Sequence, residues 1–350
     1  MPSWIAEVTR TEGGKISFER FMELALYDPN HGYYTRNISA IGPSGDFATG
    51  LTIGGALIRS IANWALAEVR CLNFRKLNII ELGGGEGHLA DGLLRLLPRL
   101  DRGQYQIVEI SDSLRQKQEK MMRGRNVAWQ KTIEAALDAA EGQALVISHE
   151  FVDAFPCKRF ELTIAGWREI ELNFDGNQWR EQLGASSELT ESSAFSIQSA
   201  LGQRIEALYS YRRWLTKMTT RLARGALLTI DYGGRPSEIY YRKPRGTMRA
   251  FFRHERLQEM EIYLRAGRQD LTADVNFLDL RNWGEAMGLR TEEYVNQAEF
   301  IRKWNGSSSW RPSGNADEYL SDESAMGGAI KVLHQRRLAE ARTSHEHFGS

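Results

Sequence analysis

The chain has 350 residues, of which 42% are hydrophobic and 26% charged, an ordinary composition for a globular protein. Basic and acidic residues balance at 45 each, which excludes a uniformly basic nucleic-acid-binding surface and an acidic tail protein. The chain has only two cysteines, Cys71 and Cys157, no signal-peptide pattern and no apolar run of membrane-spanning length. We therefore expect a cytoplasmic protein without disulfides, bound metal or membrane span.

The N-terminal part is predicted to be mainly helical. Apolar residues recur at helical spacing over Ile16–Tyr27, and a second helix is expected over about 51–69. Between them, a turn leads into a short extended piece over 28–34, and residues 42–50 form a loop of glycine and small polar residues.

Strands and helices alternate from residue 77 onward. The predicted strands are 77–82, 105–110, a short one near 127, 144–147 and 226–230, and the predicted helices are 88–97, 113–122, 132–140 and roughly 201–222. Such alternation predicts parallel strands in an open, doubly wound α/β sheet. A β-hairpin over 160–174 and an irregular stretch over 235–270 interrupt it, and a last strand is expected over 329–333.

The first of these strands runs into a glycine-rich turn. Glycines there let the backbone approach a ligand at the start of the following helix. A dinucleotide site has the pattern Gly-x-Gly-x-x-Gly, but its third glycine is His88 here. The pattern acidic-x-Gly-x-Gly-x-Gly is met by Glu81, Gly83, Gly85 and Gly87, and an acidic residue suits the ammonium and sulfonium of S-adenosylmethionine. The turn therefore favours S-adenosylmethionine over a nicotinamide cofactor.

The second strand ends at Glu109, 22 residues after Gly87. An acidic residue about 20 residues beyond such a turn can accept hydrogen bonds from both ribose hydroxyls. The alternative is that Glu109 caps the helix that begins near Ser113.

An acidic motif follows the strand over 144–147. His149, Glu150 and Asp153 should lie beside the cofactor, because ligands bind beyond the carboxyl ends of such strands. Two carboxylates three residues apart could face the same way and hold a guanidinium. The alternative is that one acid caps a helix and the other is exposed.

Further segments complete a series of motifs in chain order. They are Ile16–Tyr27 with His31–Tyr34, Gly45–Thr49, Glu81–Gly87, Glu109–Ser111 with Gln118, Glu150–Pro156, Asp231–Gly233, Gly246–Ala250 and Asp270–Ala273. With them the chain resembles, from about Ile16 to Leu333, the MidA-type S-adenosylmethionine-dependent methyltransferases. That family includes a mitochondrial assembly factor that modifies an arginine on a core subunit of respiratory complex I.

The resemblance implies a Rossmann-like class I methyltransferase sheet of seven strands. It implies a helical lid over residues 1–70, a methyltransferase domain over 71–336 with insertions near 158–200 and 235–272, and a polar tail over 337–350. Together with the residue patterns, it predicts that S-adenosylmethionine contacts Asp46, Thr49, Glu81, Leu82, Gly83, Gly85, Gly87, Glu109, Ser111 and His149.

The acceptor that the resemblance implies is an arginine side chain of a partner protein, such as a respiratory-complex subunit. We expect Glu150 and Asp153 to be the catalytic residues that grip it. The chain departs from the family pattern at Thr52, at His149, where the family has Asn, and at Asp274 and Asn276, where it has His and Asp.

Two other functions stay open: a cofactor-binding assembly chaperone without turnover, and an NAD(P)-dependent oxidoreductase. Basic and aromatic residues interleave over 235–270. Because the whole chain is neutral, we interpret this stretch as a protein-docking or homodimer surface rather than a nucleic-acid site.

Overall fold

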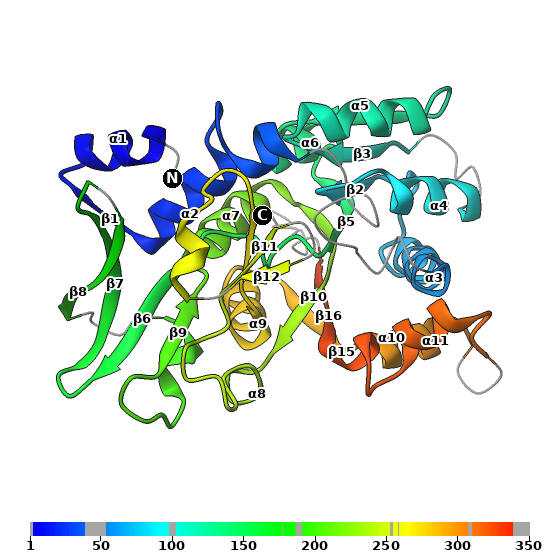
Figure 1. Cartoon of the computed structure of the whole chain (residues 1–350). Helices are drawn as coiled ribbons and strands as arrows, with labels where there is room; N and C mark the ends of the chain where they lie inside the picture. Colours follow the sequence, from blue (N-terminus) through cyan, green and yellow to red (C-terminus); the bar gives the residue numbers. More distant parts are fainter. Residues whose placement is uncertain are drawn as a thin grey trace, which may run out of the picture.

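The computed structural model describes residues 3–38, 54–97, 103–176, 178–186, 191–252, 255–257, 259–306 and 310–338. The largest sheet within these ranges has eight strands in the order β15-β16-β10-β5-β2-β3-β4, with β14 paired to β10 (Figure 1). The strands are β2 Ile79–Leu82, β3 Tyr105–Val108, β4 Val127–Gln130, β5 Gln143–His149, β10 Arg224–Gly234, β14 Val275–Asn276, β15 Arg290–Asn296 and β16 Ile330–Arg337.

The five strands from β4 to β10 are parallel, which confirms the doubly wound α/β sheet predicted from the sequence. Strands β15 and β16 close one edge with antiparallel pairing. Strand β2 is buried along its whole length, including its one charged residue, Glu81.

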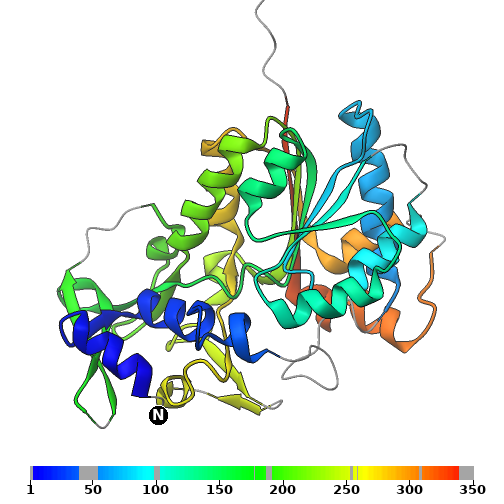
Figure 2. The same ribbon diagram turned by 90° about the horizontal axis from the view of Figure 1, so that it is seen from above.

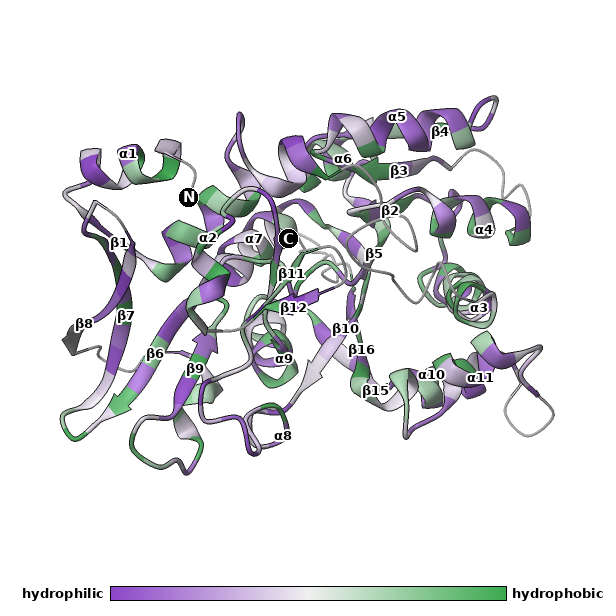
Figure 3. Ribbon diagram, viewed as in Figure 1, coloured by the Kyte–Doolittle hydropathy of each residue, from purple (hydrophilic) through white to green (hydrophobic). Residues whose placement is uncertain are grey.

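Helices cover both faces of this sheet (Figure 2). The apolar sides of α3, α4 and α10 pack on one face, and those of α6, α7 and α9 on the other. Figure 3 shows that α5 is largely hydrophilic. The helices are α3 Ala56–Cys71, α4 His88–Leu96, α5 Asp112–Met121, α6 Ile133–Ala139, α7 Tyr209–Arg221, α9 Phe277–Ala286, α10 Gln297–Trp304, α11 Asn315–Ser321 and α12 Met326–Ala329.

A second, antiparallel sheet joins the N-terminal region to the stretch that interrupts the alternation. Its order is β1-β7-β6-β9, with β8 paired to β7. The hairpin predicted over 160–174 is confirmed as β6 and β7. The elements are α1 Ser3–Thr11, β1 Lys15–Ser17, α2 Phe18–Tyr27, β6 Lys158–Thr163, β7 Gly166–Phe174, β8 Trp179–Ser186 and β9 Arg204–Ala207.

Three sequence predictions are corrected. The helix expected over 201–222 begins at Tyr209, because Arg204–Ala207 pairs with β6 as strand β9. The extended piece expected near Tyr33 is a π-helical turn, η1 Tyr33–Asn37. The stretch 235–270 is partly regular: it holds α8 Pro236–Ile239, β11 Arg249–Phe252 and β12 Glu255–Leu257, and β11 also pairs with β13 Asp270–Thr272.

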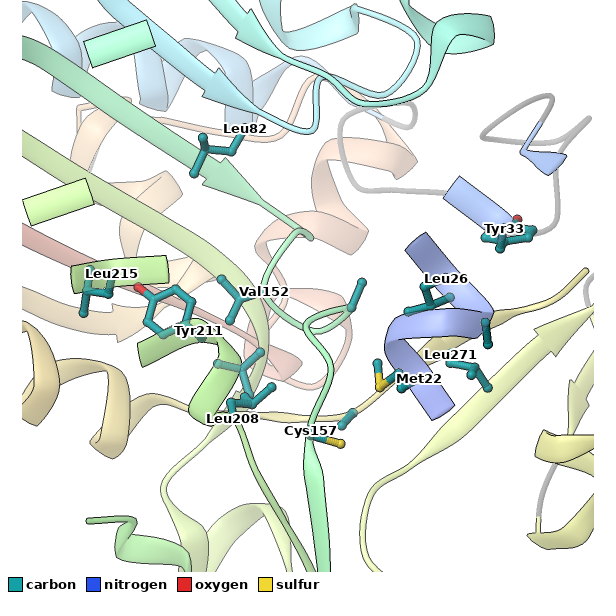
Figure 4. Close-up of a cluster of buried hydrophobic side chains, with 14 of the residues drawn as sticks. Met22, Leu26, Tyr33, Leu82, Val152, Cys157, Leu208, Tyr211, Leu215 and Leu271 are labelled. Atoms are coloured by element: carbon teal, nitrogen blue, oxygen red, sulfur yellow. The ribbon is translucent and has the colours of Figure 1, made fainter. Parts of the chain in front are cut away.

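A continuous core connects helix α2, which packs on the antiparallel sheet, to the residues beside the main sheet. Figure 4 shows Met22 and Leu26 of α2 near Leu271 and Cys157, with Val152 and Tyr211 further along the same cluster. Tyr27, at the end of α2, donates a hydrogen bond to the backbone oxygen of Ala154 at 2.9 Å. The N-terminal region is thereby held beside the residues that follow β5.

Candidate active site

A cavity of about 500 Å³ lies at the carboxyl ends of β2, β3 and β5. This volume is within the usual range for small-molecule sites. The cavity is lined by Tyr27, Tyr34, Glu81–Glu86, His88, Leu89, Val108–Ile110, Leu114, Lys131–Glu134, His149–Phe151, Ala154–Pro156, Ser210, Arg213, Trp214 and Lys217.

The glycine-rich turn lines this cavity. Gly83 and Gly85 have φ angles of +62° and +53°, a region that residues with a Cβ atom seldom adopt. A Cβ atom at Gly83 would lie 2.8 Å from the ring of Phe151. Gly87 precedes α4 with φ +96° and is not among the residues that line the cavity. The turn therefore presents backbone, not side chains, to a ligand.

Glu81 is the acidic residue that precedes the glycines. Its side chain is buried, and Tyr105 donates a hydrogen bond to its Oε2 atom at 2.7 Å. Burial, with a contribution from the nearby Glu109 carboxylate, raises the pKa of Glu81 to about 8 despite the hydrogen bond from Tyr105. At neutral pH Glu81 is therefore mostly protonated, and a cationic ligand would ionise it.

We expect ligand binding to release this proton. At pH 6.5 an ammonium group is charged and Glu81 is neutral, so pairing the two should release up to one proton for each S-adenosylhomocysteine bound. Calorimetry in buffers of different ionisation enthalpy measures the number. Glu81→Gln should abolish this release; equal release by the variant and the wild type would show that Glu81 does not meet the ammonium.

Glu109 is held in a fixed orientation at the end of β3. Its Oε1 accepts the backbone N–H of Ser111 at 2.8 Å, and its Oε2 accepts Nε2–H of Gln118 at 3.1 Å. Each oxygen keeps a second lone pair for a hydroxyl group. Burial raises the pKa of Glu109. The N-cap residue of α5 is Ser111, which lies outside the cavity lining, and Glu109 accepts the backbone N–H of this residue while it lines the cavity.

Gln118 connects the two halves of this region. Besides Glu109, its Nε2 donates to the backbone oxygen of Gly85 at 2.8 Å, and its Oε1 accepts Nε1–H of Trp129 at 2.9 Å. Gln118 belongs to the family motif around Glu109–Ser111, and no local pattern indicates these contacts. Its amide ties the glycine turn to the predicted ribose-binding carboxylate.

His149 ends β5, Glu150 follows it, and both residues line the cavity. Glu150 has φ +47°, an unusual backbone conformation for a residue with a side chain. The His149 Nε2 and Glu150 Oε1 atoms are 3.5 Å apart. Burial lowers the pKa of His149 to about 3, so its imidazole is neutral and the two do not form an ion pair.

Asp153 lies behind the cavity wall rather than in it. Its side chain is buried, and it is not among the lining residues. Asp231 accepts the backbone N–H groups of Phe151, Val152 and Asp153 at 2.8–3.3 Å, which fixes the turn after Glu150. Glu150 can therefore contact a ligand, whereas Asp153 does not reach the cavity.

Buried carboxyl groups gather beside this end of the cavity. Burial and the neighbouring carboxylates of Asp231 and Asp270 raise the pKa of Asp153 well above its ordinary value, and Glu150 adds to the effect. The cation that opposes them is Arg249, which donates in turn to Asp274. Such a cluster favours the binding of a cationic group.

Two tyrosines that the sequence analysis did not single out complete the wall. The rings of Tyr27 and Tyr34 are stacked, with centroids 5.7 Å apart, and both line the cavity. The Tyr34 hydroxyl donates to Asp270 at 2.7 Å across 236 residues of sequence. The resemblance included all three residues in its motifs, but no local pattern indicated that they meet.

The departures from the family pattern lie in different surroundings. His149 lines the cavity, whereas Asp274 accepts from Arg249 and Lys243 outside it. Asn276 caps α9 by accepting the N–H groups of Leu278 and Asp279. The predicted loop residues Asp46 and Thr49, and Thr52 after them, lie outside the described residues.

These contacts provide a test of whether S-adenosylmethionine suits the cavity. Glu81 and Glu109 supply acceptors for an ammonium group and for hydroxyls, and Glu86 adds a third carboxylate near the glycine turn. Carboxyl groups beside the glycine turn offer acceptors, whereas a pyrophosphate requires donors or cations there, which disfavours a dinucleotide. The acceptor groups that line the cavity therefore fit S-adenosylmethionine.

Comparisons with known proteins agree with this chemistry. The family described as “Putative S-adenosyl-L-methionine-dependent methyltransferase” matches residues 60–295. The chain is 29% identical over 300 residues to the protein arginine methyltransferase NDUFAF7, mitochondrial, of Danio rerio, covering 77% of this chain and 68% of that one. It is 25% identical over 359 residues to the Mus musculus protein of the same name, covering 93% and 79%.

The fold is also found in a solved structure. A Burkholderia thailandensis protein bound to S-adenosyl-homocysteine matches with a TM-score of 0.85 and 25% identity, covering 97% of this chain and 92% of that chain. Within the described residues of the present chain, no helix has the length and apolar character needed to span a membrane.

Proposed function

The chain belongs to this family of S-adenosyl-L-methionine-dependent methyltransferases, and on that premise we propose that it methylates an arginine side chain of a partner protein. The observation that carries the proposal is the cluster of Glu150, Asp153, Asp231 and Asp270 at one end of the cavity, opposed by Arg249. A guanidinium matches such a site because it is cationic, planar and rich in N–H donors. The names of the relatives support the same acceptor.

The residues that would hold the cofactor are those around the glycine turn. We assign the backbone of Gly83 and Gly85 to its methionine part, Glu81 to its ammonium group and Glu109 to its ribose hydroxyls. When bound, S-adenosylmethionine supplies a methyl group on a positively charged sulfur.

The protein contributes to the reaction by orienting the acceptor and by placing carboxyl groups near its positive charge. Methyl transfer is a direct displacement, so its rate depends on aligning the acceptor nitrogen with the methyl carbon and the sulfur. A nitrogen–carbon bond forms, the sulfur–carbon bond breaks, and one proton leaves the guanidinium. Glu150 is the carboxylate in this part of the cavity that can orient the guanidinium and accept that proton. A cation bound there would favour ionisation of the buried Asp153 carboxyl group behind the wall.

Transfer of a labelled methyl group tests the proposal. Purified protein and S-adenosylmethionine with a labelled methyl would be added to an extract of cells that lack the gene. Acid hydrolysis should recover the label as methylarginine, and Glu150→Gln protein should give almost none. Label in methyllysine, or cofactor binding with no transferred label, would contradict the proposal, and the latter result would favour an assembly chaperone.

The partner is proposed only by class. The resemblance makes a respiratory-complex subunit the first candidate, and mass spectrometry of the labelled band would identify it. The cytoplasmic location and the homodimer stay predictions; the two NDUFAF7 relatives are named as mitochondrial.

A further inference from the structure

Tyr27 and Tyr34 form an aromatic pair in the wall of the cavity. Their rings are nearly parallel, with 20° between the planes and 5.7 Å between the centroids. Both residues line the cavity and both are half-buried, so a ligand in the cavity can contact them. The proposed function gives neither residue a role, and this tyrosine pair is therefore a candidate for a further contact with the substrate.

The hydroxyl groups of the tyrosine pair are already bound to other parts of the protein. Tyr27 donates a hydrogen bond to the backbone oxygen of Ala154 at 2.9 Å, and Tyr34 donates one to Asp270 at 2.7 Å. A tyrosine hydroxyl has a single proton, so neither residue can donate to a ligand without losing one of these bonds. What the pair offers a ligand is therefore its aromatic rings.

The rings of the tyrosine pair are held in place by the rest of the protein. Each hydrogen bond fixes the far end of its ring, and the ring of Tyr33 packs edge-on against Tyr34 with the centroids 5.1 Å apart. Tyr33 is itself buried. A flat surface that is ordered before binding loses little side-chain entropy when a ligand stacks on it.

The position of the tyrosine pair indicates which ligand its rings contact. Tyr27 reaches the turn that follows Glu150, and Tyr34 reaches Asp270, one of the carboxyl groups gathered beside that turn. The pair therefore lies at the end of the cavity assigned to the acceptor. The face of an aromatic ring carries partial negative charge and attracts cations. A guanidinium is planar and weakly hydrated, so it stacks flat on such a face.

We propose that the guanidinium of the acceptor stacks on the tyrosine pair while Glu150 accepts its N–H groups. The two contacts are compatible, because the N–H groups point outward in the plane of the guanidinium and leave its face free. This inference rests on the proposed arginine acceptor. It assigns to Tyr27 and Tyr34 the binding of the planar cation that Glu150 orients.

Binding of small probes to protein saturated with S-adenosylhomocysteine tests the proposal. The probes are N-acetyl-arginine methylamide, N-acetyl-lysine methylamide and the neutral citrulline analogue, titrated by saturation-transfer NMR. The double variant Tyr27→Leu/Tyr34→Leu removes both rings, whereas Tyr27→Phe/Tyr34→Phe keeps both rings and removes both hydroxyls. Tyr241→Leu is a matched control, because Tyr241 is exposed and does not line the cavity.

We expect the double leucine variant to bind the arginine probe about tenfold more weakly than the wild type, and the citrulline analogue less than about twofold more weakly. The double phenylalanine variant should bind arginine within about threefold of the wild type, because it keeps both ring faces. Tyr241→Leu should match the wild type. Affinities for S-adenosylmethionine and S-adenosylhomocysteine report on folding and should change by the same small factor in every variant.

The wild type gives a second test that needs no substitution in the cavity. Saturation of tyrosine ring protons should transfer most strongly to the methylene group beside the guanidinium of the arginine probe. Protein grown with ring-deuterated tyrosine should lose this transfer. No transfer to that methylene group in the wild type would contradict stacking on tyrosine, even if the double leucine variant did not fold.

Three further results would overturn the inference while the arginine acceptor stands. Equal losses for arginine and citrulline would reduce the tyrosine pair to a packing surface. A phenylalanine variant as weak as the leucine variant would assign the effect to the hydroxyl bonds. Loss of S-adenosylmethionine binding without loss of S-adenosylhomocysteine binding would place the sulfonium on the rings. A wild type that binds the lysine probe as tightly as the arginine probe would instead refute the arginine acceptor.

Discussion

Glu150→Gln is expected to slow methyl transfer to arginine about 100-fold or more while leaving the affinity for S-adenosylhomocysteine within threefold of the wild type. Glu150 lines the end of the cavity where the carboxylates of Asp153, Asp231 and Asp270 gather. The substitution keeps the size of the side chain and removes the negative charge that orients the guanidinium. The loss should therefore appear in transfer and not in cofactor binding.

Two measurements separate these effects. Methyl transfer to the identified partner protein is measured under single-turnover conditions, and cofactor binding is measured by calorimetry. Glu169→Gln is a matched control, because Glu169 pairs with Lys158 on the antiparallel sheet and does not line the cavity. The control should transfer methyl groups at the wild-type rate. A Glu150→Gln enzyme that is as fast as this control would show that Glu150 does not act on the acceptor.

Gly85→Asp should weaken S-adenosylmethionine binding more than 100-fold, equivalent to about 2.7 kcal/mol. Gly85 lines the cavity with φ +53°, and its backbone oxygen accepts from Gln118. A side chain there would carry a negative charge into a space already bounded by Glu81 and Glu109. Calorimetry measures the affinity directly.

Gly124→Asp is the control that distinguishes loss of the cofactor site from the effect of backbone strain. Gly124 also has a positive φ, +79°, and a Cβ atom there would meet nothing within 4 Å. Both variants should lose about 1 kcal/mol of unfolding free energy in denaturant titrations, but only Gly85→Asp should lose the cofactor. Wild-type affinity in Gly85→Asp would mean that the glycine turn is not part of the cofactor site.

The features that the sequence predicted well are those encoded locally. An apolar strand, a glycine turn and an amphipathic helix follow one another within about twenty residues, so β2 and α4 could be placed to within about two residues. The repeated alternation of such units required a parallel sheet, and the carboxyl ends of its strands located the cavity. Glu81, Gly83, Gly85, Glu109, His149 and Glu150 all line it.

The features that the sequence missed depend on contacts between distant segments. Strand β9 is short and exists because it pairs with β6, and β1 pairs with β7 about 156 residues away. Tyr34 meets Asp270 only in the folded chain. The spacing of Glu150 and Asp153 suggested that both face one way, but the positive φ of Glu150 and the hydrogen bonds to Asp231 bury Asp153 behind the wall.

A crystal structure with S-adenosylhomocysteine bound tests the site most directly. We expect the product to lie along Gly83–Gly85 with its ribose hydroxyls on Glu109, leaving Glu150 open for the acceptor. A product molecule that covers Glu150, or one that binds away from the glycine turn, would contradict the assignment of the two halves of the cavity.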